Sequence, residues 1–297
     1  MNRKIIIVAA IMLIMAAAAG IILYRQTDTA EPTPTEAPTA TPEPTATPEP
    51  SFFEITFFDV GEADAALVNC DGSYMLIDGG NPGDSSMLYS YLEQHNIQHI
   101  DYVVCTHAHA DHVGGISGAL NYATVGTAFA PVAEYDSRAF SSFVKYLAAQ
   151  GKEISIPAAG DSFDLGSAAV TFLGPISASD NVNDTSLVLR IVYGETSFLF
   201  AADAERDEEI EILESGRTVR STLLKVGHHG SETSTSLPFA TAVDARYAVI
   251  SVGPNDYGHP SETVLDRLAK CEIYRTDLDG TIICTSNGKE LEFKTES

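Results

Sequence analysis

Residues 106–115 read Thr-His-Ala-His-Ala-Asp-His-Val-Gly-Gly and place three imidazoles and one carboxylate within six positions. They directly follow an apolar run that is typical of a buried strand. In an extended segment His107 and His109 point to the same side, because side chains alternate with a period of two. The turn that follows brings Asp111 and His112 to a second position nearby. Imidazole nitrogens combined with a carboxylate oxygen suit zinc, and also manganese or iron.

Two further apolar runs end in polar residues of the same chemistry. Asp203 follows the run 197–202, and His228 and His229 follow the run 223–227. Open sheets collect their active-site residues at such strand ends, so these side chains are candidates for the same site. The alternative for Asp203 is a helix cap, because an acidic helix is expected directly after it.

The chain has eight histidines, and none lies between His112 and His228. A binuclear metal site usually has a third imidazole on its first metal, so this chain must supply that ligand otherwise. Asn183 and Asp184, just before an expected strand, could offer an oxygen to a metal or a substrate, or could form an ordinary polar turn. His259 precedes a proline in a loop, where it could contact a substrate or serve only for packing.

The elements that must position these residues can be read from the hydrophobic periodicity. Strands are expected at 54–60, 65–70, 73–78, 101–106, 168–173, 186–193, 197–202, 221–227 and 246–252, helices at 85–95, 113–122, 140–149, 204–214, 236–243 and 261–270, and a closing hairpin at 272–293. Strands in runs with interspersed helices predict an α/β or α+β layered domain with a mixed sheet.

The first fifty-one residues predict an anchor and a stalk instead of a fold. The uncharged run 5–24 is long enough to span a bilayer and is preceded by basic residues. Segment 1–26 is therefore expected to be a single-pass membrane anchor, with a cleaved signal peptide and secretion as the alternative. Segment 27–51 is rich in Thr, Pro and Glu and predicts a disordered stalk. The globular domain is expected at 52–297, outside the plasma membrane.

The charge and the cysteines limit the function classes. The formal net charge is −24 at pH 7, and almost all of it falls after residue 51. This field repels polyanions and argues against stable nonspecific nucleic-acid binding. The four cysteines show no C-x-x-C pairing, so no structural zinc site is indicated. A disulfide between Cys271 and Cys284 is compatible with an extracellular location, but the spacing alone does not establish it.

Eight motifs, in chain order, resemble the metallo-β-lactamase fold hydrolases of the ComEC type. They lie at 58–64, 76–80, 106–115, 183–187, 198–205, 225–231, 257–260 and 275–280. The resemblance covers nearly all of the expected domain, and the His-x-His-x-Asp-His motif carries most of its specificity. It implies an αββα sandwich with a metal site at one edge of the two sheets.

Carried over position by position, the resemblance implies two divalent metal ions, Zn²⁺ or Mn²⁺, held by His107, His109, Asp111, His112, the bridging carboxylate Asp203, and His228. His229 is the alternative to His228, and Asp78 is expected to order the ligand loop. The chain departs from the family's commoner pattern at Ala202, where glycine is usual, and at Glu62, where glutamine is usual. These departures concern the local geometry and not the ligand set.

Two such cations can bridge a water, lower its pKa and deliver hydroxide to an ester, and a phosphodiester fits this arrangement best. The expected catalytic residues are Asp111, Asp203, Lys225 and His229, and the expected substrate-binding residues are Asn183, Asp184, Ser231 and His259. Lys225, His229 or His259 could hold the developing oxyanion or protonate the leaving group.

The sequence therefore predicts an extracytoplasmic, membrane-anchored, metal-dependent hydrolase. Its expected substrate is an anionic phosphodiester, such as DNA or a phosphate-bearing wall polymer, or a small ester. The alternatives are a metal-dependent binding module without turnover and a lactam hydrolase. The ComEC relatives place this domain beside a multi-helix DNA channel, a role that the single apolar span does not support.

Overall fold

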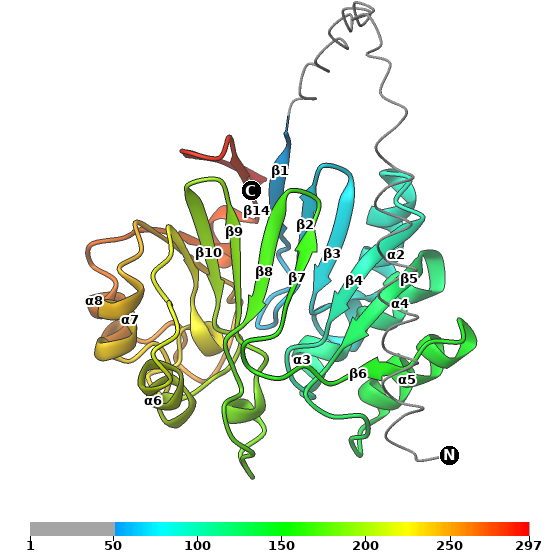
Figure 1. The fold of residues 1–297 in the computed structure, drawn as a ribbon, viewed down its shortest axis with the longest axis horizontal. Helices are drawn as coiled ribbons and strands as arrows, with labels where there is room; N and C mark the ends of the chain where they lie inside the picture. The colour runs from blue at the N-terminus through cyan, green and yellow to red at the C-terminus, as the bar shows by residue number, and fades with distance from the viewer. Residues whose placement is uncertain (1–50, 297) are drawn as a thin grey trace, which may run out of the picture. The chain divides into compact units, whose positions relative to one another are not determined.

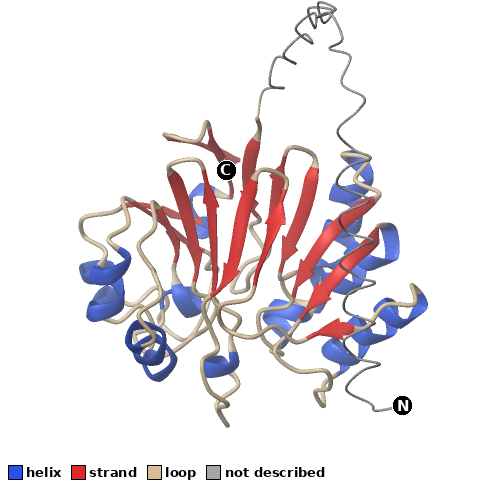
Figure 2. Cartoon of the chain, viewed as in Figure 1, coloured by secondary structure: helices blue, strands red, loops and turns tan. Residues whose placement is uncertain are grey.

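The computed structural model describes residues 51–296, in which two β-sheets pack face to face between two layers of helices (Figure 1; Figure 2). This confirms the expected αββα sandwich. The expected anchor, 1–26, and nearly all of the expected stalk, 27–51, lie outside the described residues. Within the part of the chain that is described, no helix is both long and apolar enough to cross a bilayer.

The first sheet has eight strands. In spatial order they are β15 (Leu291–Glu296), β14 (Thr281–Ser286), β1 (Phe53–Phe57), β2 (Ala66–Cys70), β3 (Ser73–Ile77), β4 (His99–Val104), β5 (Thr124–Phe129) and β6 (Ile154–Ser155). Neighbours from β15 to β3 pair antiparallel, and those from β3 to β6 pair parallel. The chain therefore leaves β3 and β4 at the same edge of the sheet.

The second sheet has seven strands. In spatial order they are β13 (Glu272–Arg275), β12 (Tyr247–Ile250), β11 (Leu223–Lys225), β10 (Thr196–Phe200), β9 (Leu189–Tyr193), β8 (Ala168–Phe172) and β7 (Ser162–Leu165). Neighbours from β10 to β13 are parallel, and those from β7 to β10 are antiparallel. The carboxyl ends of β10, β11 and β12 thus also meet at one edge.

Helices cover the outer face of each sheet (Figure 2). The first sheet is covered by α2 (Ser85–Gln94), α3 (Ala110–Val113), α4 (Ile116–Tyr122) and α5 (Arg138–Ala149), and the second by α6 (Arg206–Glu214), α7 (Leu237–Val243) and α8 (Glu262–Arg267). Short helices η1 (Pro82–Asp84), η2 (Asn183–Thr185), η3 (Gly227–Gly230) and α9 (Thr276–Asp279) lie in the connections.

The period of two along the strands explains why the two sheets face each other. Phe198 and Phe200 of β10 point into the apolar layer between the sheets, whereas Leu199 packs against the outer helices. Across that layer, Phe53 stacks on Phe198 and Phe57 stacks on Phe200, with ring centroids 4.7 Å and 5.8 Å apart. Strands buried on both faces read as continuous apolar runs, which is why β10 was recognisable in the sequence.

Two expectations about the strands were wrong or incomplete. The segment 272–293 does not form one hairpin: β13 pairs parallel with β12 in the second sheet, and the hairpin is β14 with β15 in the first. The short helix α9 separates them and carries the chain from one sheet to the other. The strands β5, β6 and β7 were not predicted, because β6 and β7 are short edge strands and β5 contains Gly126, which breaks the apolar pattern.

Glu208 of α6 is a carboxylate buried beneath the outer helices, with only 2% of its surface exposed. It accepts a hydrogen bond from the backbone N–H of Ile176 at 3.2 Å. Burial raises the pKa of Glu208 to about 8, and burial likewise raises the pKa of the neighbouring Glu209 to about 7. Between about pH 5 and pH 8 the folded protein keeps protons on these carboxyl groups, whereas the unfolded chain has already released them near its ordinary pKa of 4.5. The free energy of unfolding therefore falls as the pH rises through this range.

We expect the Glu208→Gln variant to lose part of this pH dependence. At pH 5 it should match the parent, and at pH 9 it should be more stable by roughly 2–4 kcal/mol, because no charge is then buried at this position. Denaturant unfolding at pH 5, 7 and 9 measures the difference, with Glu214→Gln at the exposed end of the same helix as the control. An unchanged decline in the Glu208→Gln variant would contradict the burial argument.

Candidate metal centre

The strand ends of both sheets meet at one edge of the sandwich, and the chemistry-bearing residues lie there. Asp78 follows β3, the segment 106–112 follows β4, Asp203 follows β10, and His229 follows β11. In Figure 1 this edge is at the bottom of the two sheets. The convergence follows from the parallel pairing of β3 with β4 and of β10 with β11.

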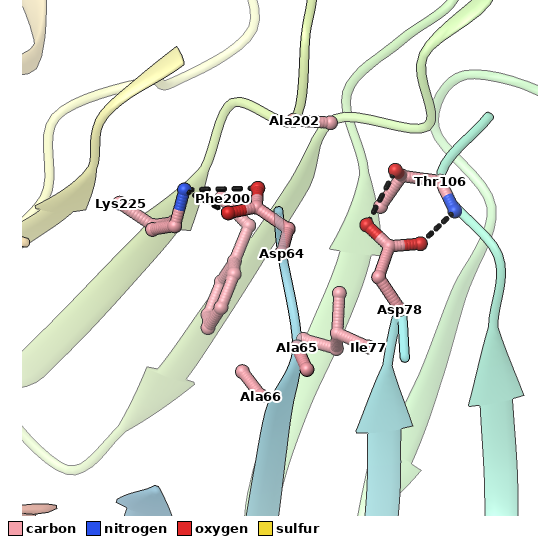
Figure 3. Close-up of a pocket in the computed structure, with 9 residues that line it drawn as sticks. All are labelled: Asp64, Ala65, Ala66, Ile77, Asp78, Thr106, Phe200, Ala202 and Lys225. Atoms are coloured by element: carbon pink, nitrogen blue, oxygen red, sulfur yellow. Dashed lines mark hydrogen bonds and ion pairs between the residues drawn. The ribbon is translucent and has the colours of Figure 1, made fainter. Parts of the chain in front are cut away.

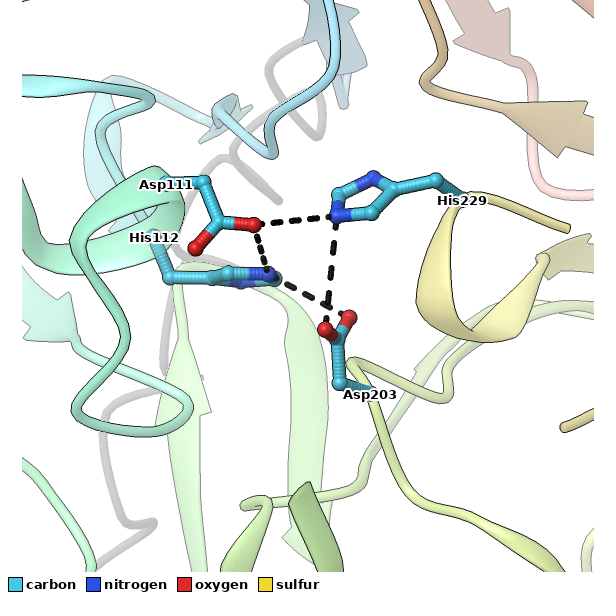
Figure 4. A group of neighbouring side chains, drawn as sticks. All are labelled: Asp111, His112, Asp203 and His229. Atoms are coloured by element: carbon cyan, nitrogen blue, oxygen red, sulfur yellow. Dashed lines mark hydrogen bonds and ion pairs between the residues drawn. The ribbon is translucent and has the colours of Figure 1, made fainter. Parts of the chain in front are cut away.

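One group contains Asp111, His112, Asp203 and His229 (Figure 4). One potential ligand atom from each lies within 4.8 Å of the others. His112 Nε2 is 3.2 Å from Asp203 Oδ1, and His229 Nε2 is 3.3 Å from Asp111 Oδ2. The four side chains come from both sheets and point toward a common centre, so they could hold one cation.

A second group contains His107, His109 and Asp203. His107 Nε2 is 3.1 Å from His109 Nδ1 and 3.7 Å from Asp203 Oδ2. Asp203 belongs to both groups, and its two oxygens lie nearest different histidines. These residues could thus hold two cations in adjacent positions, with the carboxylate of Asp203 between them.

Asp78 ties the ligand loop to the first sheet. Its carboxylate accepts hydrogen bonds from Thr106 N at 2.7 Å and Thr106 Oγ1 at 2.6 Å (Figure 3). It also lies 2.8 Å from His112 Nδ1. His229 Nδ1 similarly lies 3.0 Å from the carbonyl oxygen of Ser251. A histidine whose Nδ1–H is held in this way presents the Nε2 lone pair to the centre. Asp78 is thus hydrogen-bonded to the loop that carries the expected ligands.

The electrostatics of the site fit a cation. His112 Nε2 and Asp203 Oδ1 are fully buried, face each other, and have no hydrogen-bond partner among the described residues. Buried polar atoms without a partner are costly, and a cation between them would remove that cost. Burial acts to raise the pKa of Asp203, but His112, His229 and His107 outweigh it and hold that pKa well below its usual value. Burial lowers the pKa of His107 well below its usual value, which favours the neutral, ligating imidazole.

Backbone strain is concentrated at this edge. Asp78, Ala202, His228 and His229 all have positive φ angles, of 57°, 49°, 49° and 53°. Residues other than glycine rarely adopt a positive φ angle, and those that do cluster at functional sites. The departure from the family's commoner glycine at Ala202 is therefore tolerated at the cost of backbone strain, and the turn still delivers Asp203 to the centre.

The expected catalytic role of Lys225 is not supported by its placement. Its side chain is 4% exposed, and its ammonium lies 2.7 Å and 2.9 Å from the two oxygens of Asp64 and 3.2 Å from the carbonyl of Val226 (Figure 3). Asp64 in turn bonds through its backbone to Asp111 and Gly80. Lys225 therefore joins the second sheet to the loop that carries the ligands, beneath the centre and away from solvent.

The expected substrate-binding residues Asn183, Asp184 and Ser231 are buried around Glu205. Asn183 Nδ2 donates to Glu205 Oε1 at 3.0 Å, and Asp184 Oδ1 accepts from Glu205 N at 3.0 Å. Ser231 Oγ lies 3.0 Å from Thr233 Oγ1 within the turn after the paired histidines. The structure thus brings these residues close to the centre, where they shape the wall around Glu205.

His259 lies beside His228. Its Nδ1 is 2.7 Å from Glu62 Oε1, and its ring centroid is 5.8 Å from that of His228. Asn255 holds the loop by accepting three backbone N–H groups and by donating to Glu62 Oε2 at 3.3 Å. Tyr257, which is exposed, stacks on His259 with centroids 5.6 Å apart. These contacts hold the ring of His259 in place next to that of His228.

A groove of about 630 Å³ lies beside this region. Glu205 and Thr233, which both contact His228, form part of its wall. Arg206 and Arg267 are also among the lining residues. The groove gives a substrate room next to the centre, and its lining carries four carboxylates, those of Asp184, Glu205, Asp207 and Glu232, beside the two guanidinium groups.

Three residues with clear contacts in this geometry were not predicted from the sequence to make them. Asp64 pairs with Lys225, Glu62 with His259, and Glu205 with His228. All three stood inside motifs that carried the family resemblance. Their spacing gave no indication of a role, because each partner lies on a distant segment.

The sequence and the fold match known proteins. The family model described as Metallo-beta-lactamase superfamily matches residues 59–253. The chain is 27% identical over 251 residues to ComE operon protein 3 of Bacillus subtilis, covering 77% of this chain and 32% of that protein. It is 31% identical over 235 residues to Competence protein ComA of Neisseria gonorrhoeae, covering 77% of this chain and 31% of that protein. The chain thus spans about a third of the length of these relatives.

Among solved structures, the metallo-beta-lactamase fold protein YhfI of Bacillus subtilis superposes with a TM-score of 0.54. The match covers 79% of this chain and all of YhfI, at 13% sequence identity. At this identity the likeness shows the fold alone. It agrees with the two-sheet sandwich described above.

Proposed function

The chain belongs to the metallo-beta-lactamase superfamily of metal-dependent hydrolases, and from this premise we propose that it is a phosphodiesterase that uses two divalent cations. The observation that carries the proposal is the buried, unpartnered pair His112 Nε2 and Asp203 Oδ1, 3.2 Å apart. Two groups this close without a hydrogen bond are best satisfied by a cation.

The proposal assigns each cation its own set of residues. The first would be held by His107, His109 and Asp203. The second would be held by Asp111, His112, His229 and the same Asp203, so His229 takes the place that the sequence assigned to His228. Both assignments follow the groups of ligand atoms that lie within 4.8 Å of one another. Zinc and manganese both accept this set of imidazole and carboxylate donors.

Such a pair of cations supplies Lewis acidity and makes hydroxide available from water at neutral pH. The residues of the chain hold the cations and fix the orientation of the ligand side chains. Asp78 and the Ser251 carbonyl fix the imidazoles of His112 and His229, so the ligand atoms stay aimed at the centre without substrate. His259, which Glu62 orients and which lies beside His228, would give a proton to the leaving oxygen.

A phosphodiester is the substrate class that the surroundings favour. The domain is strongly acidic, so a polyanion must be held by local positive charge, which the two cations would provide. The name of one relative, Competence protein ComA, refers to competence, which favours DNA as the substrate. A phosphate-bearing wall polymer offers the same chemistry. We further propose an extracytoplasmic location behind a membrane anchor at 1–26, on the sequence pattern alone.

The full chain, supplied with Zn²⁺ or Mn²⁺, should hydrolyse bis-p-nitrophenyl phosphate, and a chelator should abolish this activity until metal is restored. Single-stranded DNA, teichoic acid fragments and a chromogenic lactam, tested in parallel, would then rank the natural substrate classes. Turnover of the lactam alone, or activity that resists complete removal of metal, would overturn the proposal.

A further inference from the structure

Tyr257 is the most exposed of the large apolar and aromatic side chains among residues 51–296, with 78% of its surface accessible. One face of its ring stacks on His259, with ring centroids 5.6 Å apart and planes inclined by 28°. The opposite face of the ring is therefore open to solvent. A single exposed ring needs no explanation by itself, but the position and the rigidity of this one indicate a function.

The stack of rings continues from Tyr257 to the candidate metal centre. The ring of His259 lies 5.8 Å from that of His228, and His228 Nε2 lies 3.6 Å from Asp203 Oδ2. Two successive ring contacts thus connect Tyr257 to the carboxylate at the middle of the site. A substrate with its phosphate at the centre would therefore bring a neighbouring group to the open face of Tyr257.

The loop that carries Tyr257 is held by hydrogen bonds of its own. Asn255 Oδ1 accepts from the three successive backbone N–H groups of residues 257–259, at 3.1, 2.9 and 3.0 Å. The backbone N–H of Ser261 donates to the carbonyl oxygen of Gly230 at 2.9 Å, which ties the loop to the turn of the paired histidines. An aromatic ring on a loop that is already ordered binds a ligand without a further cost of ordering that loop.

The chemistry of this loop favours a planar ring over a sugar or a phosphate. A sugar is held by hydrogen bonds to its hydroxyl groups, but both N–H donors of the Asn255 amide already bond to the carbonyl oxygens of Gly253 and His259, at 2.9 Å each. Asp256 is exposed and adds a negative charge to the loop, which disfavours a phosphate there. Stacking of a base on an aromatic ring needs neither a charge nor a specific hydrogen bond.

We propose that Tyr257 determines the specificity of the site by stacking on an unpaired nucleobase next to the phosphodiester that is cleaved. The inference rests on the proposed phosphodiesterase function and deepens it, because it selects nucleotides over phosphodiesters that lack a planar ring. Stacking suits a strongly acidic domain, since its contribution to affinity does not depend on attracting a polyanion. A base that is paired and stacked in a duplex has no free face, so the preferred substrate is single-stranded.

The test measures kcat and KM of the full, metal-loaded chain on three phosphodiesters: oligothymidylate, an abasic deoxyribose-phosphate oligomer of the same length, and a glycerol-phosphate oligomer. We expect the parent to prefer oligothymidylate. Tyr257→Ala should lose about 5- to 100-fold in kcat/KM on this substrate, through a higher KM, and should change little on the other two. Tyr257→Phe should keep the preference of the parent, because it keeps the ring.

The matched control is Phe52→Ala, which removes another exposed aromatic ring. Phe52 is 44% exposed and lies just before β1. This strand runs in the same direction as β3 and so begins at the end of the sheet that is remote from the centre. The control should leave kcat and KM unchanged on all three substrates.

A second measurement reports the contact without catalysis. The chain contains no tryptophan, so Tyr257→Trp introduces a single indole at this position. Its fluorescence, followed by stopped flow before turnover, should be quenched by oligothymidylate and not by the abasic or the glycerol-phosphate oligomer. The fluorescence of the control variant Phe52→Trp should change with none of the three.

Equal kcat/KM of the parent on the base-bearing and abasic oligomers, or an unchanged KM for oligothymidylate in Tyr257→Ala, would overturn the inference and leave the phosphodiesterase proposal in place. Equal quenching of Tyr257→Trp by the abasic oligomer would overturn it as well. A parent that prefers the glycerol-phosphate oligomer would do the same and would favour a wall polymer. A metal-loaded parent that hydrolyses none of the three would instead defeat the proposed function, and the inference with it.

Discussion

Replacing Asp203 by alanine should reduce phosphodiester hydrolysis by roughly 10²- to 10³-fold or more and should lower the affinity for both cations. Asp203 is 1% exposed, and its two oxygens face His112 on one side and His107 and His228 on the other. Its removal takes one anionic ligand from each position at once. The measurement is the rate with bis-p-nitrophenyl phosphate together with the metal content of the same sample.

The control for this prediction is Asp164→Ala, which removes an exposed carboxylate from β7 in the same sheet. It should change neither the rate nor the metal content. Because His109 lies only in the first group, His109→Ala should weaken one cation, whereas Asp203→Ala should weaken both. Full activity in Asp203→Ala would show that the carboxylate does not bridge.

Replacing Lys225 by methionine should destabilise the fold by about 3–5 kcal/mol, because it leaves the Asp64 carboxylate buried without its cation. Burial acts to raise the pKa of Asp64, but Lys225, His229 and His112 outweigh it and lower that pKa below its usual value. Without the ammonium the carboxylate should take up a proton more readily. The free energy of unfolding by denaturant at pH 7 measures the effect.

The double variant Asp64→Asn with Lys225→Met should recover most of the lost stability, since no unpaired charge remains buried. It also separates a structural role from a catalytic one. If Lys225 only joins the two sheets, the folded double variant should keep both cations. A single variant as stable as the parent would contradict the buried ion pair.

The parts of the site that depend on local spacing could be predicted from the sequence. His107 and His109 lie in the connection after β4, and Asp111 and His112 lie in α3 directly after it, so their convergence needs no knowledge of distant segments. Asp203 could be predicted because β10 is an uninterrupted apolar run that ends there. The layered fold followed from the alternation of such runs with helical periods.

The remaining features depend on how distant segments pair. The partnership of Asp64 with Lys225 joins residues 161 positions apart, and no local pattern indicates it. Which of His228 and His229 faces Asp111 depends on the left-handed backbone angles of both residues, and these angles cannot be inferred from two adjacent histidines in the sequence. The passage of the chain from the second sheet to the first at α9 was not predicted either. It depends on the pairing of β13 with β12, which is set by tertiary packing and not by the local sequence.

An anomalous difference map from crystals of the protein grown with Zn²⁺ or Mn²⁺ would test the proposed pair of cations. We expect two peaks about 3.5–4 Å apart, with Asp203 between them. One peak should lie against His107 and His109, and the other against Asp111, His112 and His229. A single peak remote from Asp203, or no peak at this edge of the sheets, would exclude a pair of cations shared by Asp203.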